Sequence, residues 1–232
     1  MLELIVVRHG ESIRNYASKI AHQGDLTLLD TQLKEDDYEP GWSLTELGQE
    51  QAEKTGKWIE EVWGSQPDIV FASPYRRTLQ TARCLNLKPI ALQDWRLRER
   101  RWGDYTAVGE PYTAEQYLED LRHAGEPNWR PPFPGAEAVQ DLIPQVREFV
   151  VDNLTNLDGK KVVLVTHGGA MKALQSVIEG SVDDPTQTSV PNSSALRFRL
   201  NSLDDEGKGN GDVDLETPWM PDGGHGHWQH FG

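Results

Sequence analysis

The sequence predicts an α/β fold in which a mainly parallel sheet carries helices on both faces, giving three layers (α/β/α). Three short apolar runs, residues 2–7, 68–72 and 161–166, are rich in Val and Ile and largely lack polar alternation. Such runs are typical of parallel strands that are buried on both faces. Turn-forming residues and a helix-like pattern follow each run, and strands that alternate with helices produce this fold class.

The helix after the third run is the clearest of the predicted helices. Met171, Leu174, Val177 and Ile178 recur at helical spacing, which gives the helix one apolar face. Gly180 follows the last of them and suits the left-handed conformation that ends many helices. We therefore expect this helix to pack against the sheet.

Two more helices are predicted from signals at their N-termini. After the second run, Ser73 is a candidate N-cap and Pro74 a candidate first helical residue, with an apolar stripe beyond them. Earlier in the chain, Ser43 and Glu46 have the spacing of a capping box for a helix that runs toward Trp63.

The second half of the chain adds one more helix and one more strand. Apolar residues from 139 to 149 recur at helical spacing, but Pro144 must either kink that helix or begin a new one. Residues 195–200 alternate between apolar side chains and arginine, which predicts a strand with one solvated face.

These elements predict a single domain over residues 1–200. Residues 104–136 are rich in proline and contain only a weak helix near residues 113–121, so we expect an inserted lid beside the site. Residues 20–42 are predicted to form a surface loop or flap. Residues 201–232, rich in Gly and Asp, are predicted to form a loosely ordered tail.

Composition limits the classes of partner. The chain has 232 residues, a formal net charge of −14 and 37% hydrophobic residues, which fits a globular protein and disfavours nucleic acid or an anionic membrane as partner. A lone cysteine, Cys84, excludes an intrachain disulfide and a cysteine zinc cluster. With no leader-like or membrane-spanning run, we expect a soluble, cytoplasmic protein.

Two histidines occupy matching positions after predicted strands. His9 lies in the run Arg8-His9-Gly10-Glu11 after the first strand, and His167 lies in Thr166-His167-Gly168-Gly169 after the third. Ligands of open α/β sheets bind at the carboxyl ends of the strands, so both histidines are expected at one site. Arg76 and Arg77 fall in the first turn of a predicted helix, where a guanidinium and free backbone N–H groups suit phosphate.

Five motifs, in order over residues 1 to about 180, resemble those of the histidine phosphatase superfamily, the phosphoglycerate-mutase-like proteins. The motifs are Arg8-His9-Gly10-Glu11-Ser12 with Asn15, Leu44-Thr45-Glu46-Leu47-Gly48, Ser73-Pro74-Tyr75-Arg76-Arg77, Leu97-Arg98-Glu99-Arg100-Arg101, and Val165-Thr166-His167-Gly168-Gly169. The run Pro134-Gly135-Ala136-Glu137 departs by one residue from the usual Gly-Gly-Glu. The resemblance implies a phosphoglycerate-mutase-like fold, selects Arg77 over Arg76, and places the catalytic acid at Glu99.

The residues themselves suit attack on a phosphomonoester. A phosphoryl dianion needs positive charge and donors around its oxygens, which Arg8, Arg77 and His167 can supply together with the Gly168 backbone N–H. His9 is then the candidate nucleophile, kept neutral by the neighbouring arginines.

Glu99 is the candidate proton donor to the leaving alcohol and the candidate base for the water that follows. Because the arginines supply positive charge, no metal or other cofactor is predicted. The histidines of the tail, at 225, 227 and 230, lack carboxylate or cysteine partners and are not predicted to be a metal site. The remaining candidates for binding the phosphate or the substrate are Ser12, Asn15, Arg100 and Arg101.

The leading functional hypothesis is a metal-independent phosphatase that hydrolyses a small phosphorylated metabolite through a phosphohistidine. The alternative is a 2,3-bisphosphoglycerate-dependent phosphoglycerate mutase, which the resemblance implies would carry a longer insertion between acid and second histidine. Only 67 residues separate Glu99 from His167 here, which favours hydrolysis. An inactive relative that binds phosphorylated ligands is the third hypothesis. A homodimer is left open.

Overall fold

The computed structural model describes residues 1–35, 41–181, 190–210 and 214–221. In this part of the chain a six-stranded sheet has the order β3-β2-β4-β1-β5-β8. Its first four strands in that order are parallel, whereas β5 runs antiparallel to β1, and β8 runs antiparallel to β5. The strands are β1 (Leu2–Arg8), β2 (Ile69–Ala72), β3 (Leu92–Gln93), β4 (Lys161–Thr166), β5 (Ala195–Leu200) and β8 (Asp214–Trp219). The predicted α/β fold with a mainly parallel sheet is confirmed.

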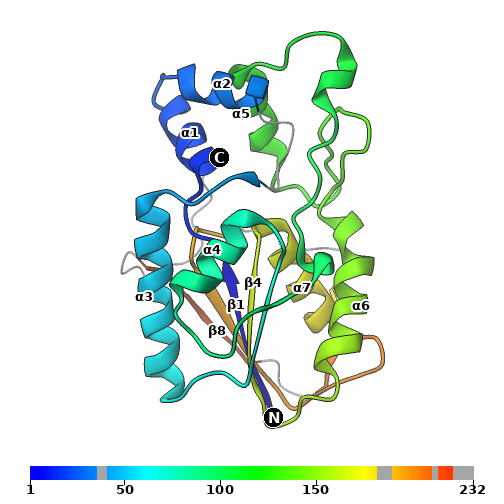
Figure 1. Cartoon of the computed structure of the whole chain (residues 1–232). Helices are drawn as coiled ribbons and strands as arrows, with labels where there is room; N and C mark the ends of the chain where they lie inside the picture. The colour runs from blue at the N-terminus through cyan, green and yellow to red at the C-terminus, as the bar shows by residue number, and fades with distance from the viewer. Residues whose placement is uncertain (36–40, 182–189, 211–213, 222–232) are drawn as a thin grey trace.

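Two pairs of helices cover the two faces of the sheet (Figure 1). Helices α3 (Glu46–Trp63) and α4 (Arg76–Cys84) lie on one face, and α6 (Ile143–Leu154) and α7 (Gly168–Glu179) lie on the other. The Gly180 cap of α7 has the left-handed conformation that the sequence predicts, with φ 70°.

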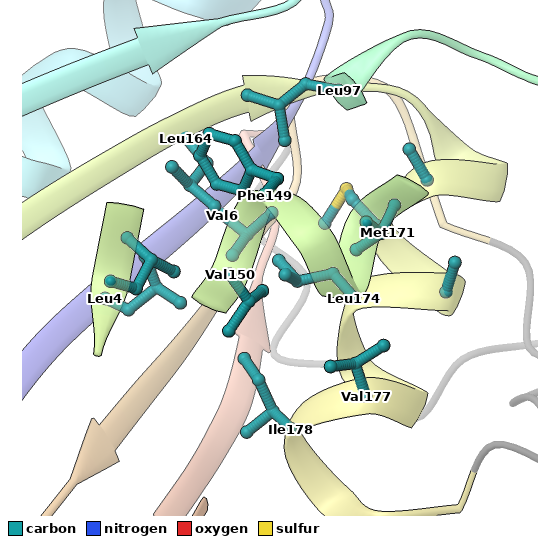
Figure 2. Packing of buried hydrophobic residues seen from close by; sticks show 14 of the residues in the cluster. Leu4, Val6, Leu97, Phe149, Val150, Leu164, Met171, Leu174, Val177 and Ile178 are labelled. Atoms are coloured by element: carbon teal, nitrogen blue, oxygen red, sulfur yellow. The ribbon is translucent and has the colours of Figure 1, made fainter. Parts of the chain in front are cut away.

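Alternate residues of the central strand β1 point to opposite faces, as strand geometry requires. Leu4 and Val6 join the core beneath α6 and α7, whereas Ile5 and Val7 join the core beneath α3 and α4. All four side chains are fully buried. Figure 2 shows Leu4 and Val6 facing apolar side chains of α6 and α7. This two-sided burial holds the carboxyl end of β1 rigidly in place.

The N-termini of two helices differ from the prediction. Helix α3 is capped by Thr45, whose hydroxyl accepts from Gly48 N at 3.0 Å, and not by Ser43, whose carbonyl accepts from Ile13 N. Helix α4 begins at Arg76 after an N-cap at Tyr75, because the Ser73 hydroxyl is engaged with a buried histidine.

Pro144 begins a new helix, one of the two outcomes that the sequence left open. A short 3-10 turn, η4 (Gln140–Leu142), precedes α6, and proline occupies the first turn, where its missing N–H costs nothing.

A separate group of helices forms a cap above the carboxyl end of the parallel strands (Figure 1). It consists of α1 (Ile13–Ala21), α2 (Thr27–Glu35), α5 (Ala114–His123) and the 3-10 turn η3 (Tyr105–Val108), which share one apolar cluster. The predicted weak helix in the inserted lid is thus α5. The predicted loop over residues 20–42 is wrong for residues 27–35, because Leu29 and Leu33 are buried one helical turn apart in this cluster.

The predicted tail is also wrong in its first part. Strands β6 (Ser202–Leu203) and β7 (Gly209–Asn210) form a small hairpin, and β8 pairs with β5 at the edge of the main sheet. Backbone pairing to an open sheet edge does not require apolar periodicity, so no side-chain pattern predicts this strand. The tail histidines lie outside the described residues. No helix in the described ranges has the length and apolarity to cross a membrane.

Candidate active site

His9 lies where β1 ends, and its side chain is 4% exposed. Its Nδ1 lies 2.8 Å from the Gly10 carbonyl oxygen, which can only accept, so Nδ1 carries the proton. Its Nε2 accepts from Arg77 Nε at 3.2 Å. Burial and then the charges of Arg77 and Arg8 hold the pKa of His9 well below its usual range. The imidazole is therefore neutral, with its lone pair on Nε2.

Arg8 and Arg77 bring two guanidinium groups beside His9. Arg8 Nη1 donates to the carbonyl of Val190, whereas its buried Nε has no partner in the described residues. Burial lowers the pKa of Arg8 to about 10, against an opposing effect of Glu99, so Arg8 stays cationic at neutral pH. Arg77 is 3% exposed, while Arg76 is exposed, which agrees with the choice between them.

The ring of His167 packs edge-on against the ring of His9. Their ring centroids are 5.3 Å apart, and His167 is completely buried, so it does not line the cavity described below. Its Nε2 is 2.8 Å from Ser73 Oγ, while its Nδ1 has no partner in the described part of the chain. Ser73 Oγ also accepts a hydrogen bond from Tyr75 N at 3.4 Å. Burial, then Arg77, lowers the pKa of His167 well below its usual range.

Glu99 reaches the same site from the loop after β3. One carboxylate oxygen accepts from Arg100 N at 3.0 Å, and the other accepts from Gly169 N at 3.2 Å in the first turn of α7. Gly169 has room for this contact only because it lacks a side chain, since a Cβ there would lie 2.3 Å from Glu99 Oε1.

A buried ion pair anchors the loop that carries Glu99. Arg98 donates two hydrogen bonds to Glu137, at 2.6 and 2.7 Å, and both residues are under 10% exposed. Glu137 also accepts from Arg101 N and from the exposed Arg101 guanidinium. The structure therefore does not bring Arg101 to the cavity, contrary to its expected role in binding the substrate.

Arg100 lines the cavity, but its guanidinium is engaged with the cap. It donates to the Ala124 carbonyl at 3.1 Å and to the Trp129 carbonyl at 3.4 Å, and it lies 5.5 Å from the Trp102 ring centroid. These contacts connect the loop that holds Glu99 to the cap.

Ser12 and Asn15 cap the N-terminus of α1 and line the cavity. Asn15 Oδ1 accepts from Ser12 N, Ser12 Oγ and Asn192 Nδ2, at 3.1, 2.8 and 3.1 Å. With the oxygen committed, Nδ2 is the atom of Asn15 that can donate to a ligand. Gly168 lines the cavity as predicted.

These residues surround a cavity of about 450 Å³ between the sheet and the cap. Its charged lining is mainly basic, which suits an anionic ligand. The basic lining residues are Arg8, Arg14, Arg77, Arg100, Arg122 and Lys172, and the acidic ones are Glu99 and Glu126. Among the described residues no group of three or more His, Cys, Asp or Glu could hold a metal ion.

Sequence reasoning missed several residues that line the cavity. Arg14 lies in the first turn of α1, and Trp42 and Tyr117 flank it. Lys172 lies on α7 one turn after Gly168, and this i, i+4 spacing was the available signal. Burial, then Arg100, lowers the pKa of Lys172 to about 8.

Comparisons with known proteins bear on the sequence and on the fold. Residues 4–202 match the sequence profile described as Histidine phosphatase superfamily (branch 1). A 2,3-bisphosphoglycerate-dependent phosphoglycerate mutase of Rhizobium etli is 26% identical over 212 residues, which cover 87% of this chain and 92% of that protein.

Two solved structures have the same fold. A mycobacterial glucosyl-3-phosphoglycerate phosphatase complexed with VO3 matches with a TM-score of 0.62 and 24% identity, covering 85% of this chain and 92% of that one. A phosphoserine phosphatase of Entamoeba histolytica, in complex with 3-phosphoglyceric acid, matches with a TM-score of 0.63 and 20% identity, covering 94% and 96%. At these identities the likeness concerns the fold alone.

Proposed function

This chain belongs to branch 1 of the histidine phosphatase superfamily, and we propose that it is a metal-independent phosphatase acting on a small phosphomonoester through a phosphohistidine. The observation that carries the proposal is the state of His9: neutral, with Nδ1–H held by the Gly10 carbonyl and the Nε2 lone pair beside Arg77. A neutral, oriented imidazole between two guanidinium groups is what attack on a phosphoryl dianion requires.

In the first step, His9 Nε2 forms a bond to phosphorus while the bond to the leaving alcohol oxygen breaks. Arg77 Nε then turns from Nε2 to a phosphoryl oxygen, and the unpartnered Arg8 Nε donates to another. His167 Nδ1 has no partner in the described residues, but His167 is completely buried and lies outside the cavity lining, so this step assigns it no contact with the phosphoryl group. Glu99 gives its proton to the leaving oxygen.

In the second step, water attacks the phosphorus of phospho-His9 and the bond from nitrogen to phosphorus breaks. Glu99 takes the proton of the water and returns to its starting state. The Gly169 and Arg100 N–H groups hold the carboxylate in one place for both transfers. Orientation of this kind accounts for a large part of the rate enhancement in such reactions.

A mutase uses the same residues but returns the phosphoryl group to the substrate. The short connection of 67 residues from Glu99 to His167 supports hydrolysis, because it adds only the cap helix α5 and short turns before α6. The mutase is kept as the second candidate because the Rhizobium etli relative, which this chain matches over most of its length, bears that name.

The test compares the wild type with His9→Ala, and with His22→Ala as a control at an exposed histidine. Phosphate release is followed from 4-nitrophenyl phosphate and from a panel of sugar and glycerate phosphates, with and without a chelator. Isomerisation of 3-phosphoglycerate is followed with and without 2,3-bisphosphoglycerate. A base-stable, acid-labile phosphoryl adduct on the peptide that contains His9 is sought by mass spectrometry.

We expect phosphate release that His9→Ala abolishes, that His22→Ala retains and that the chelator leaves unchanged. Isomerisation that depends on bisphosphoglycerate, with little free phosphate, would establish the mutase instead. Equal turnover by wild type and His9→Ala would refute the mechanism altogether. Inhibition by the chelator that a divalent ion reverses would refute the metal-free form of the proposal.

A further inference from the structure

Arg14 is a buried charge that the reaction just described does not use. It lies in the first turn of α1, its side chain is 3% exposed, and it lines the cavity. Its Nε and Nη1 atoms are buried and make no hydrogen bond within the described ranges. A buried guanidinium without an anionic partner is costly, so an unpaired one facing a cavity points to a ligand that supplies the anion.

Two aromatic rings hold the Arg14 guanidinium in place. Its Cζ lies 4.8 Å from the Trp42 ring centroid and 4.3 Å from the Tyr117 ring centroid. Cation–π contacts offset part of the burial cost but satisfy none of the N–H groups. Trp42 Nε1 is likewise buried without a partner in the part of the chain described. Unsatisfied donors on two neighbouring side chains therefore accompany the positive charge.

The position of Arg14 separates it from the atoms that hold the scissile phosphoryl group. The charges that depress the pKa of His9 belong to Arg77 and Arg8. Arg14 lies against Tyr117 of the cap helix α5 and is absent from those charges. Arg14 and Arg77 lie 4.8 and 5.5 Å from the same Trp42 centroid, so their Cζ atoms are at most about 10 Å apart. A small metabolite can bridge that span.

We propose that Arg14, held between Trp42 and Tyr117, determines substrate specificity by binding a second anionic group, a carboxylate or a phosphate, on the leaving group of the substrate. This inference rests on the proposed function and adds the class of substrate. The planar guanidinium fork matches either anion in a bidentate arrangement, which an ammonium cannot reproduce. Arg100 is less suited to the role, because its Nη atoms already donate to cap carbonyls.

The test uses pairs of substrates that differ only in the second anion. 3-Phosphoglycerate is paired with glycerol 3-phosphate for a carboxylate, and fructose 1,6-bisphosphate with fructose 6-phosphate for a phosphate. The variants are Arg14→Gln, Arg14→Lys and, as a control for loss of one positive charge, Arg76→Gln, whose arginine is exposed and outside the cavity lining. Thermal unfolding of each variant is recorded alongside kcat/KM.

We expect the wild type to prefer, in at least one pair, the substrate that carries the second anionic group. The pair that shows this preference identifies that group as a carboxylate or a phosphate. Arg14→Gln should lower kcat/KM for that member roughly 10- to 100-fold, and for its partner by less than about 3-fold. Arg14→Lys should retain charge and fold but recover only part of the preference. Arg76→Gln should behave as the wild type.

Equal losses on both members of a pair would place Arg14 at the scissile phosphoryl group and overturn the proposal. Unchanged preference, with only a lower unfolding temperature, would give Arg14 a purely structural role and also overturn it.

A binding measurement separates failure of this inference from failure of the proposed function. Calorimetric Kd values for 3-phosphoglycerate and glycerol 3-phosphate are obtained on His9→Ala and on His9→Ala with Arg14→Gln. A selective loss for the carboxylated ligand supports the Arg14 subsite even if the wild type hydrolyses nothing. If Arg14→Gln leaves both Kd values unchanged and the same holds for the fructose phosphates, the subsite is refuted while phosphatase activity can stand.

Discussion

Gly169→Ala tests the role of Glu99 without altering any titratable group. The new Cβ would lie 2.3 Å from Glu99 Oε1 and 3.3 Å from its carboxyl carbon. Leu142 Cδ1 would lie 3.5 Å from the new Cβ, and Leu142 is fully buried, so the surrounding packing leaves the methyl group little room. The carboxylate must therefore move, and it loses the 3.2 Å hydrogen bond from residue 169 N.

The size of the effect follows from these distances. To reach ordinary van der Waals contact the carboxylate oxygen must retreat by about 1 Å, and a displacement of that size at a reacting group costs on the order of 100-fold in rate. Alanine is favoured over glycine in a helix by up to about 1 kcal/mol, so Gly169→Ala in α7 should not unfold the protein. The loss should thus appear in kcat and not in thermal stability.

The assay compares a poor and a good leaving group on the same preparations. Gly169→Ala should lose about 100-fold on 3-phosphoglycerate but much less on 4-nitrophenyl phosphate, whose leaving group needs no proton. Glu99→Gln should show the same selectivity, and combining the two changes should cost little more than Glu99→Gln alone. Equal losses on both substrates, or full additivity in the double variant, would refute the assignment of Glu99 as the proton donor.

Three further predictions concern the groups around the site. His9 and His167 have lowered pKa values in the folded protein, so below about pH 6.5 the unfolded state binds more protons and the free energy of unfolding decreases as the pH falls. His9→Asn should reduce this dependence by up to about 1.4 kcal/mol per pH unit, measured by urea unfolding at pH 7.0, 6.0 and 5.5. Lys172 lines the cavity and loses its charge as the pH rises through about 8, so KM for an anionic substrate should rise there in the wild type but not in Lys172→Arg. The same dependence of KM on pH in both proteins would exclude Lys172 from substrate binding. Glu137→Ala leaves the Arg98 charge buried and unpaired and should lower the free energy of unfolding by about 3–5 kcal/mol, whereas a loss under 1 kcal/mol would contradict the inferred anchoring of the Glu99 loop.

The sheet and the helices that cover it were predictable because their burial leaves a periodic record in the sequence. The strands β1, β2 and β4 appear as apolar runs since helices cover both their faces, and α7 appears through its apolar stripe. The sequence pattern is less informative where single hydrogen bonds from backbone groups or hydroxyls determine the local structure. Ser73 looks like an N-cap, but its hydroxyl bonds His167, a residue 94 positions away.

The cap was harder to predict because its parts are scattered along the chain. The buried residues of helix α2 pack against α1 and α5, which come from other parts of the chain. Taken alone, residues 20–42 are mostly polar, so their sequence does not indicate a buried helix. The edge strand β8 forms through backbone pairing with β5, for which side chains carry little information.

The residues of the site divide in the same way. His9, Arg8 and Gly168 follow directly from strand ends, so they were predictable. The helix start offered both Arg76 and Arg77, and the family resemblance chose Arg77. Arg101 was misplaced because four arginines crowd residues 96–101, and only the partner of each one, such as Glu137 for Arg101, reveals which of them faces the cavity.

Helix α1 connects the strand end that carries His9 to the cap. Its N-cap Ser12 and Asn15 lie beside the strand end that carries His9, and its later residues Ala17 and Ala21 are buried in the cap. Arg14 lies in the same first turn as Ser12 and Asn15, and its guanidinium packs against the rings of Trp42 and of Tyr117 in the cap helix α5. Because the phosphoryl site depends on the sheet and the Arg14 subsite on the cap, changes in the cap can alter the choice of leaving group while the chemistry at His9 is preserved.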